Sequence, residues 1–422
     1  MQKEDKILRM FFEPERWQYA IAKGVDKDIR KDQLYRLTSP ETRARLYLAI
    51  RDGKYRISPP HTAQIPKDNG DFRTVYVNEP VDRVVLSIAN DLLFELMPDM
   101  VHPRCRSYLK GTGCGRVVQE VSSRVCAGGD GIVGWKSDLS KYFDSVPIQY
   151  VDEAFDKVEA RHGHSALVDV LRDYYHSDLF FDTDNTLQSH YQSLKQGCAV
   201  AAWLADVVIF HIDKQLAGLN GYYVRYSDDM LFVGPDYAQA MDILRTELAK
   251  MQMTLNRDKV KYLDHAHWFK FLGFSIKGHD ISISPTRLKT FQHEIEKRTI
   301  KVRDITPAKA VNAVNKYLYK GYGDFSWATQ ILPIINVRKD INTLNGFVVD
   351  CLRAVATGKH KIGGLGFVKT QAEGCIQRGR GRNVRANRQK TDIRIEGFLS
   401  IGCMQRAMLT SREAYLTLVA NL

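Results

Sequence analysis

The sequence predicts a mixed α/β protein of the α+β kind, in which helices surround an antiparallel sheet. The first indication is YYVRYSDDMLFVG at 222–234, where two β-prone runs flank Ser-Asp-Asp, a sequence that favours a tight turn. The second is a set of apolar residues at helical spacing on both sides of this segment. The third is a change near residue 277, after which Ser-Pro and Thr-Pro pairs begin new helices. We therefore expect a mixed N-terminal part and a mainly helical C-terminal part.

Periodicity and turn chemistry place the elements of the N-terminal part. Val81, Val84, Ile88 and Leu92 recur at the spacing of a helix. In chain order we expect a mostly helical segment over 1–60, a β-hairpin with an Asp-Asn-Gly turn over 65–73, a helix over 81–97, a basic Gly-rich loop over 105–116, a strand over 132–139, helices over 148–175 and 199–212, a β-hairpin over 222–234, a helix over 237–251, and strands near 263 and over 271–276.

The C-terminal part reads as helical and basic. The pairs Ser284-Pro285 and Thr306-Pro307 are signals for helix starts, so helices are expected over about 286–303 and 307–320. The stretch IQRGRGRNVRANRQK at 376–390 contains six basic residues and no acidic one. Such a stretch either binds RNA electrostatically or is a solvated linker.

Composition bounds the class of protein. The 422 residues allow two or three domains, and the net charge of +12 suits a polyanionic partner. No apolar run approaches the ~18 residues of a membrane span, and the start of the chain lacks a secretory apolar segment. We therefore expect a cytoplasmic protein that does not contact membranes. The seven cysteines form no CxxC pair, which predicts free thiols rather than a zinc site or disulfides.

Three aspartates are candidate metal ligands. Asp138 ends the strand expected at 132–139, and Asp228 and Asp229 lie in the turn of the hairpin at 222–234. Carboxylates at the ends of buried strands suit Mg²⁺, and a pair of such ions promotes phosphoryl transfer. The alternative is that they are ordinary strand-end and turn aspartates.

The surrounding motifs resemble those of reverse transcriptases, in the family's order. YSDD at 226–229 resembles the Tyr-x-Asp-Asp box, DLSKYFDSV at 138–146 the first palm motif, and LKQGCAVAAWLAD at 194–206 the Gln-Gly motif with its helix. LNRDKVKYLD at 255–264 and FKFLGFSI at 269–276 resemble the next two motifs. The resemblance implies a right-hand polymerase that adds dNTPs to a primer on an RNA template, with two Mg²⁺ ions.

The resemblance also implies domains and catalytic roles. The domains would be an N-terminal helical segment at 1–60, fingers at 61–137, a palm with part of the fingers at 138–276, and a helical thumb with a basic extension at 277–422. Asp138, Asp228 and Asp229 would hold the metal ions. Lys259 would protonate the leaving pyrophosphate, with an exposed helix-end lysine as the alternative. Phe143 would be the steric gate that rejects a ribose 2′-hydroxyl, and core packing is the alternative for this ring.

Further residues match positions that bind nucleotide in the family. Gln196 and Gly197 would shape the floor of the nucleotide pocket. Lys67 and Arg73, on the hairpin at 65–73, would clamp the incoming triphosphate, for which arginine offers a bidentate fork.

A third group is expected to contact nucleic acid. Arg83 would contact the template or serve a structural role, and Leu272 and Gly273 belong to the segment that grips the primer. Lys110 and Arg116 are expected phosphate contacts. The basic stretch would contribute Arg378, Arg380 and Arg382.

The chain departs from the family pattern at three places. Lys195 replaces the usual proline before the Gln-Gly pair, Ala201-Ala202 replaces Ser-Pro, and Ser227 stands where bacterial enzymes usually have alanine. These changes leave the metal ligands intact, and they put in doubt both ordinary template handling and a close kinship with intron or retroviral enzymes.

The C-terminal part shows neither an RNase H carboxylate cluster nor a paired-cysteine nuclease motif. In this it resembles the bacterial retron, abortive-infection and defence-associated reverse transcriptases. We therefore expect an enzyme that copies a structured non-coding partner RNA in antiphage defence. Two alternatives remain, an untemplated DNA polymerase and a maturase-like RNA-binding protein, and the sequence does not give the oligomeric state.

Overall fold

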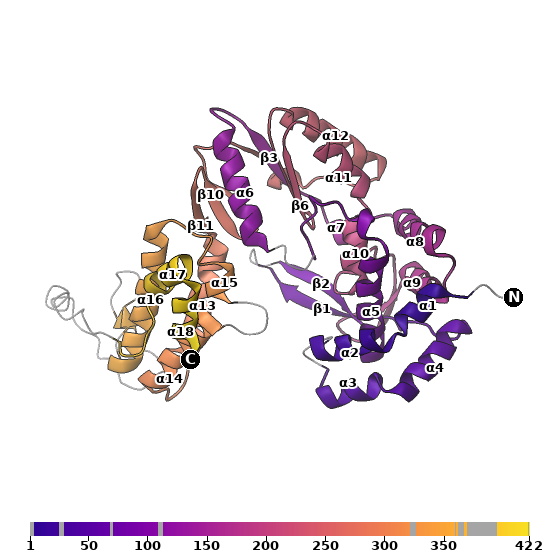
Figure 1. Ribbon diagram of the computed structural model, residues 1–422, viewed down its shortest axis with the longest axis horizontal. Helices are drawn as coiled ribbons and strands as arrows, with labels where there is room; N and C mark the ends of the chain where they lie inside the picture. The colour runs from indigo at the N-terminus through magenta and orange to yellow at the C-terminus, as the bar shows by residue number, and fades with distance from the viewer. Residues whose placement is uncertain are drawn as a thin grey trace. The chain divides into compact units, whose positions relative to one another are not determined.

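The computed structural model divides the chain into two compact units (Figure 1). The first contains residues 1–110 and 134–262, and the second contains residues 111–133 and 263–422. Within these bounds the structure describes residues 4–24, 29–67, 71–108, 113–320, 326–358, 395–420 and 422, and the backbone of the short strands at 360–361 and 367–368. The division of the chain into fingers, palm and thumb stays a prediction.

The first unit combines helices with two sheets. Its helices are α1 (Lys6–Phe11), α2 (Pro14–Lys23), α3 (Lys31–Leu37), α4 (Pro40–Arg51), α5 (Pro80–Leu96), η1 (Pro98–Met100), α7 (Tyr142–Ser145), α8 (Ile148–His162), α9 (Ala166–His176), α10 (Val200–Val207), α11 (Phe210–Ala217), α12 (Tyr237–Lys250) and η2 (Arg257–Lys259). Its strands are β1 (His61–Pro66), β2 (Phe72–Val77), β3 (Gly134–Asp138), β4 (Leu179–Phe181), β5 (Leu187–Ser189), β6 (Tyr222–Tyr226), β7 (Asp229–Val233) and β8 (Lys261–Leu263), which ends where the second unit resumes.

Helix α5 forms the centre of the helical part of this unit. It begins with Pro80 in its first turn, where a missing N–H is harmless, and its residues Val84, Ile88 and Leu92 are all buried. Helices α1, α2 and α10 pack against it. The helix expected over 81–97 is thereby confirmed.

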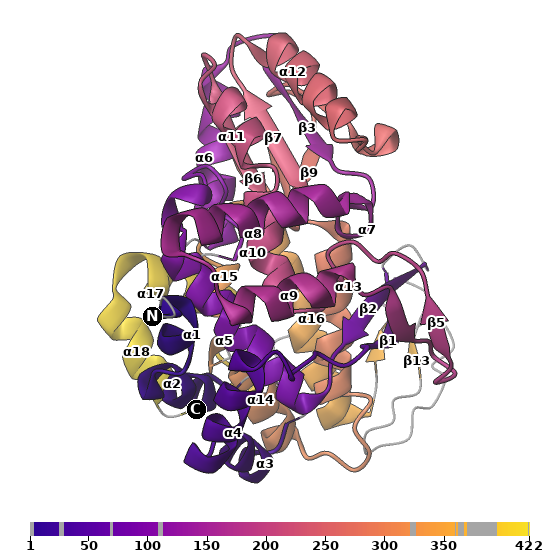
Figure 2. The same cartoon turned by 90° about the vertical axis from the view of Figure 1, so that its right-hand side faces the viewer.

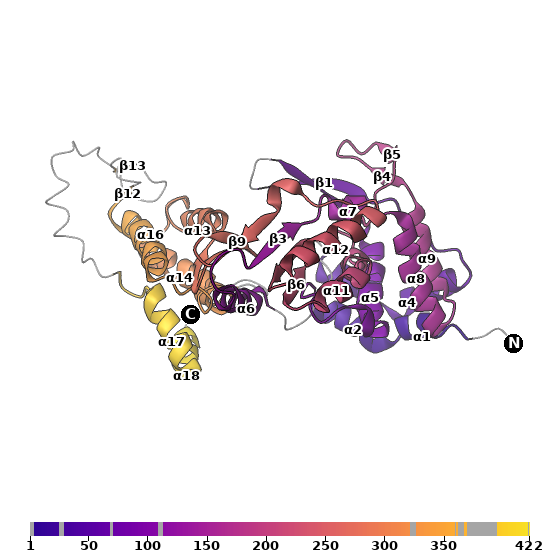
Figure 3. The same cartoon turned by 90° about the horizontal axis from the view of Figure 1, so that it is seen from above.

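The four-stranded sheet has the order β6-β7-β3-β8. Strand β7 pairs antiparallel with both β6 and β3, and this confirms the expected hairpin. A Cβ atom at Gly134 would lie 2.1 Å from the Phe232 carbonyl oxygen, so this close approach of β3 to β7 needs glycine. Helices α11 and α12 pack against strands of this sheet (Figure 3), and the Trp135 indole donates to the Tyr237 carbonyl at 2.7 Å.

A second four-stranded sheet, with the order β2-β1-β4-β5, contains the hairpin expected over 65–73 (Figure 2). Its strands β1 and β2 are antiparallel, with Ile65 opposite Arg73. Outside the hairpin, β1 meets β4 in parallel at a single residue pair, His61 and Phe181.

The second unit is mainly helical, as expected. Its elements are α6 (Cys114–Ala127), β9 (Phe269–Phe271), β10 (Phe274–Lys277), β11 (Asp280–Ile283), α13 (Pro285–Arg298), α14 (Pro307–Asn315), the π-helix η3 (Lys316–Lys320), α15 (Trp327–Gln330), α16 (Arg338–Thr357), β12 (His360–Lys361), β13 (Phe367–Val368), α17 (Ile401–Thr410) and α18 (Arg412–Ala420).

Capping and sheet pairing organise the second unit. The side chains of Ser284 and Thr306 accept from backbone N–H groups at the starts of α13 and α14, so both predicted helix starts are confirmed. Strand β10 lies between β9 and β11, and α6 packs against β10 and β11. The Ser122 hydroxyl of α6 donates to the Gly278 carbonyl at 2.7 Å.

Two expected long helices are wrong. The helix expected over 148–175 is split into α8 and α9 at Gly163, which has a φ of +89° that ends a right-handed helix. The helix expected over 199–212 is split at Ile209, which leaves helical geometry between α10 and α11. The joint at Ile209 lies inside an apolar run, where periodicity alone does not show a break, whereas Gly163 lies among polar residues and is followed by the N-cap Ser165 of α9. Among the described helices, none is both long and apolar enough to span a bilayer.

Candidate active site

The three candidate metal ligands lie together at one end of the sheet β6-β7-β3-β8. Asp138, the last residue of β3, pairs in register with Asp229, the first residue of β7. Asp228 lies in the two-residue loop before Asp229, and its carbonyl accepts from the Leu139 N–H at 3.2 Å. Asp138 is 5% exposed. Residues from motifs 90 positions apart in the sequence therefore form one carboxylate cluster.

Burial and like charge disfavour ionisation of this cluster. Burial, followed by the neighbouring charges of Asp138 and Asp229, raises the pKa of Asp228 to about 6. Burial also raises the pKa of Asp229, and the Lys136 ammonium partly opposes that rise. A raised carboxylate pKa means that ionising the free site costs free energy, which a divalent cation would recover.

Two lysines face the carboxylates. Lys259 forms an ion pair with Asp138. Lys136, two residues before Asp138 on β3, has a pKa lowered by burial and raised in part by Asp229 and Asp138. Three carboxylates against two ammonium groups leave a negative excess, and this oxygen-only donor set fits Mg²⁺.

The expected nucleotide-pocket residues of the Gln-Gly motif contact β2. The Tyr76 N–H donates to the Gln196 carbonyl at 2.7 Å. Gly197 has a φ of +111°, and a Cβ atom there would lie 2.8 Å from the Tyr76 carbonyl oxygen. Only glycine allows this loop to approach the hairpin so closely.

Phe143 belongs to the short helix α7, five residues after Asp138. Its ring is half-buried beside Tyr142, with the centroids 5.7 Å apart, and its carbonyl accepts from the Leu194 N–H at 3.0 Å. The chain therefore joins the first palm motif to the Gln-Gly motif by a direct hydrogen bond.

Lys67 and Arg73 lie on the β1–β2 hairpin with exposed side chains. The Lys67 N–H donates to the Asp71 carbonyl at 2.7 Å, and Arg73 is paired with Ile65. Burial raises the pKa of Asp144, next to Phe143, and the positive charges of Lys141 and then Lys67 oppose that rise. The charge of Lys67 on the hairpin therefore acts on the α7 segment.

Lys195, which replaces the family's proline, is fully buried without a carboxylate partner among the described residues. Its ammonium donates to the carbonyls of Tyr175 at 3.4 Å and Ser177 at 3.1 Å and lies over the rings of Tyr174 and Tyr175. Burial lowers its pKa to about 8. The lysine supports the Gln-Gly loop from within the core.

The other expected contact residues lie outside this cluster. Arg83 is half-buried on α5. Arg116 is exposed on α6 of the second unit and is paired with Glu120 at 3.3 Å. Leu272 and Gly273 form the β9–β10 turn of that unit, where Arg287 donates to the Leu272 carbonyl at 3.3 Å. Lys110, Arg378, Arg380 and Arg382 lie outside the described residues.

A buried polar network beneath the carboxylates was not expected from the sequence. Arg225, immediately before the Tyr-Ser-Asp-Asp box, is 0% exposed and donates to both carboxylate oxygens of Asp213, at 2.8 and 2.6 Å. Asp206 joins the network through Ser107 at 2.7 Å. The available signal was the presence of Asp206 and Asp213 within otherwise apolar helical runs.

The family profile of reverse transcriptases, "Reverse transcriptase (RNA-dependent DNA polymerase)", matches residues 65–276, which is half of the chain. The chain belongs to this family. The match begins at the β1–β2 hairpin and ends in β10, so it includes all the motifs described above.

Comparison with known proteins gives more distant similarities. The "Putative COX1/OXI3 intron 1 protein" of Saccharomyces cerevisiae is 22% identical in an alignment of 331 positions that covers 64% of this chain and 38% of that protein. The chain therefore spans well under half the length of this curated relative. A telomerase of Candida albicans with a telomeric RNA fragment and an apo telomerase of Candida tropicalis are each 12% identical over 71% of this chain, covering 59% and 57% of theirs, with TM-scores of 0.41 and 0.44. Both TM-scores are below 0.5, so we draw no conclusion about this chain from these two structures.

Proposed function

We propose that the chain is an RNA-directed DNA polymerase that adds dNTPs to a primer. The observation that carries the proposal is the cluster of Asp138, Asp228 and Asp229 at the paired ends of β3 and β7, inside the motifs of the reverse transcriptase family. The proposal includes two Mg²⁺ ions held by these carboxylates. Two bound divalent ions supply activation of the attacking oxygen and stabilisation of the leaving one.

The chain's own residues would divide the remaining work. Lys259, paired with Asp138, would hold a proton beside the site where pyrophosphate leaves. The cations Lys67 and Arg73 would hold the triphosphate, and Arg73 can do so with two parallel hydrogen bonds. The ring of Phe143 would stand against C2′ of the incoming sugar and exclude a hydroxyl there.

The direct test is the double substitution Asp228→Ala with Asp229→Ala. Primer extension on an RNA template with dNTPs should fall at least a thousandfold, because two of the three carboxylates are lost. Asp242→Asn, an exposed aspartate on α12, is the matched control and should extend primers at the wild-type rate.

Thermal unfolding and RNA binding should be largely retained in the double variant, since removing mutually repelling carboxylates does not weaken the core. Incorporation that persists in the double variant would remove the metal role from Asp228 and Asp229. Wild-type protein that binds RNA tightly but never extends a primer would favour the maturase-like alternative.

We further propose that the template is a structured non-coding partner RNA, that the setting is antiphage defence, and that the enzyme works in the cytoplasm. The support for this finer proposal is the resemblance to compact bacterial reverse transcriptases, together with the net charge of +12. Untemplated synthesis would use the same carboxylates. Sequencing the DNA product would distinguish it from templated synthesis.

A further inference from the structure

The loop that carries Asp228 has a backbone conformation that is unfavourable for the serine at its first position. Tyr226 pairs with Asp229, so Ser227 and Asp228 form a two-residue hairpin loop. Ser227 has a φ of +57°, and Asp228 is not among the residues with positive φ. This is the pattern of a type II′ turn, whose first loop position favours glycine. A serine in this conformation needs other interactions to hold it.

Those interactions come from three directions. The Ser227 N–H donates to the Ser107 hydroxyl at 3.0 Å, and its carbonyl accepts from the Arg225 guanidinium at 3.3 Å. The hydroxyl groups of Ser227 and Tyr108 form a hydrogen bond at 3.1 Å. Every polar group of Ser227 is therefore bound.

Two of these partners lie on one segment, residues 104–108, which we name the brace. The brace runs alongside β6: Cys105 forms a parallel bridge with Arg225, the Arg106 N–H donates to the Arg225 carbonyl at 2.8 Å, and the Arg225 N–H donates to the Arg104 carbonyl at 2.9 Å. These bonds fix the register of the brace on β6, and Ser107 and Tyr108 are carried to the catalytic turn as a result.

Hydrogen bonds to buried charged side chains orient the brace. The Ser107 hydroxyl donates its single proton to Asp206 at 2.7 Å, so its lone pairs are left to accept the Ser227 N–H. Arg225, fixed by Asp213, lies 3.6 Å from Asp206. All three charged side chains are 0% exposed, and such networks hold one geometry because breaking any member strands a buried charge.

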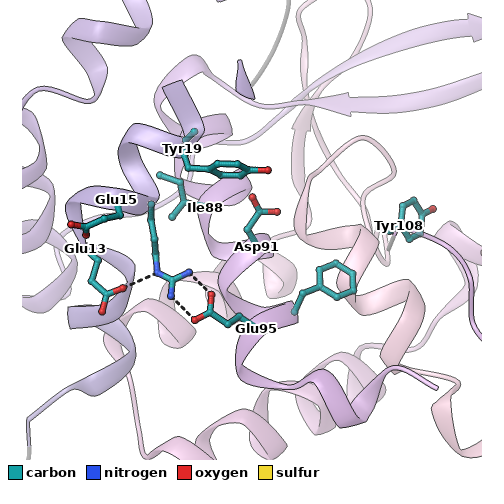
Figure 4. A pocket seen from close by; sticks show the side chains of 10 residues that line it. Glu13, Glu15, Tyr19, Ile88, Asp91, Glu95 and Tyr108 are labelled. Carbon is teal, nitrogen blue, oxygen red and sulfur yellow. Dashed lines mark hydrogen bonds and ion pairs between the residues drawn. The ribbon is translucent and has the colours of Figure 1, made fainter. Parts of the chain in front are cut away.

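Tyr108 connects the brace to the surface. It is 46% exposed and lines an open pocket of about 590 Å³ (Figure 4). The lining also includes Arg16, which forms ion pairs with Glu13 and Glu95. Four carboxylates line this pocket, so it does not suit a triphosphate. The interaction of Tyr108 that concerns the catalytic turn is the hydrogen bond between its hydroxyl and that of Ser227.

We propose that the brace positions the catalytic turn, with Tyr108 and Ser107 as positioning residues that act through Ser227 on Asp228. The inference rests on the proposed function, because it gives the turn its metal-binding task. The Asp228 carbonyl is held from the opposite side by Leu139, so the carboxylate is presented between two fixed supports. Ser227 stands where the resemblance to bacterial enzymes leads us to expect alanine, and the link to Tyr108 depends on its hydroxyl.

The test is a cycle of Tyr108→Phe, Ser227→Ala and the double variant, each of which removes only hydroxyl groups. Mn²⁺ binding, followed by electron paramagnetic resonance without nucleic acid or nucleotide, reports on the carboxylates directly. A half-exposed neutral hydrogen bond changes an equilibrium constant by about three- to tenfold. Each single variant should therefore weaken Mn²⁺ binding by about that factor, and the double variant by no more than either single one.

Primer extension gives the second readout. The Mg²⁺ concentration at half-maximal rate should rise by the same factor in all three variants, while KM for dNTP stays within about twofold. Tyr35→Phe, an exposed tyrosine on α3 that is 61% accessible, is the matched control and should leave both readouts unchanged.

Mn²⁺ affinity within twofold of wild type in both single variants would overturn the proposal, and so would effects that multiply in the double variant. The metal readout also separates this inference from the proposed function. Protein that never extends a primer, but whose Mn²⁺ affinity depends on the Tyr108–Ser227 pair, would overturn the polymerase assignment and support the brace.

Discussion

Phe143 is held by its backbone more than by its ring. Its carbonyl accepts from the Leu194 N–H, and this bond does not depend on the side chain, which is half-buried against the core. Phe143→Ala should admit ribonucleotides because the collision with a 2′-hydroxyl disappears. We expect the ratio of kcat/KM for dNTP over rNTP to fall at least tenfold in single-nucleotide incorporation.

The control for this residue is Phe72→Ala, which removes an exposed ring, 62% accessible, from the β1–β2 hairpin. It should leave sugar discrimination unchanged. If Phe143→Ala keeps the wild-type ratio, the ring is a packing residue and the gate lies elsewhere.

Some residue positions could be predicted from the sequence, and others could not. Strand ends and a hairpin turn are local patterns that singled out Asp138, Asp228 and Asp229, and the resemblance to reverse transcriptases placed them in one site. The bond between Tyr108 and Ser227 could not be predicted, since it joins residues 119 positions apart whose side chains give no pattern of their own. The buried position of Lys195 was equally hidden, because a lysine normally predicts an exposed site.

At the scale of elements, the packing of the loop that carries Gln196 and Gly197 against β2 depends on one contact. Gly197→Ala combines a φ of +111° with a Cβ atom 2.8 Å from the Tyr76 carbonyl oxygen, so the loop must move away from the hairpin. We expect a loss of about 1–3 kcal/mol in the free energy of unfolding and a several-fold higher KM for dNTP, measured by denaturant titration and primer extension.

Gly53→Ala is a matched control for that substitution. Gly53 also has a positive φ, +64°, but no atom lies within 4 Å of the added Cβ. Gly53→Ala should lower the free energy of unfolding only by the backbone strain at this positive φ, and it should leave the KM for dNTP unchanged. An equal rise in KM for both variants would show that the Gln-Gly loop does not shape the nucleotide pocket through its approach to β2.

Helix and strand positions were largely predictable, and the two errors have different causes. The helix α5, the hairpin β6–β7 and the capped starts of α13 and α14 follow from periodicity, turn residues and Ser-Pro or Thr-Pro pairs. The joint at Ile209 was missed because apolar residues continue on both sides of it. At Gly163 the local sequence did carry a signal, a glycine with positive φ followed by the N-cap Ser165, and this signal was overlooked.

At the scale of the whole molecule, the chain places its carboxylate cluster in the first unit and its most helical, basic part in the second. The net charge of +12 suits an RNA or primer–template partner, held mainly through phosphate contacts. The reverse transcriptase family profile matches residues 65–276, which is half of the chain.

The measurement that tests the central claim most directly is sequencing, separately, the RNA and the DNA that co-purify with the protein from its host. The proposed function predicts one enriched structured RNA, with complementary DNA that is present for the wild type and absent for the Asp228→Ala, Asp229→Ala variant. DNA that matches no RNA would contradict templated synthesis, and enriched RNA without aspartate-dependent DNA would contradict polymerase activity itself.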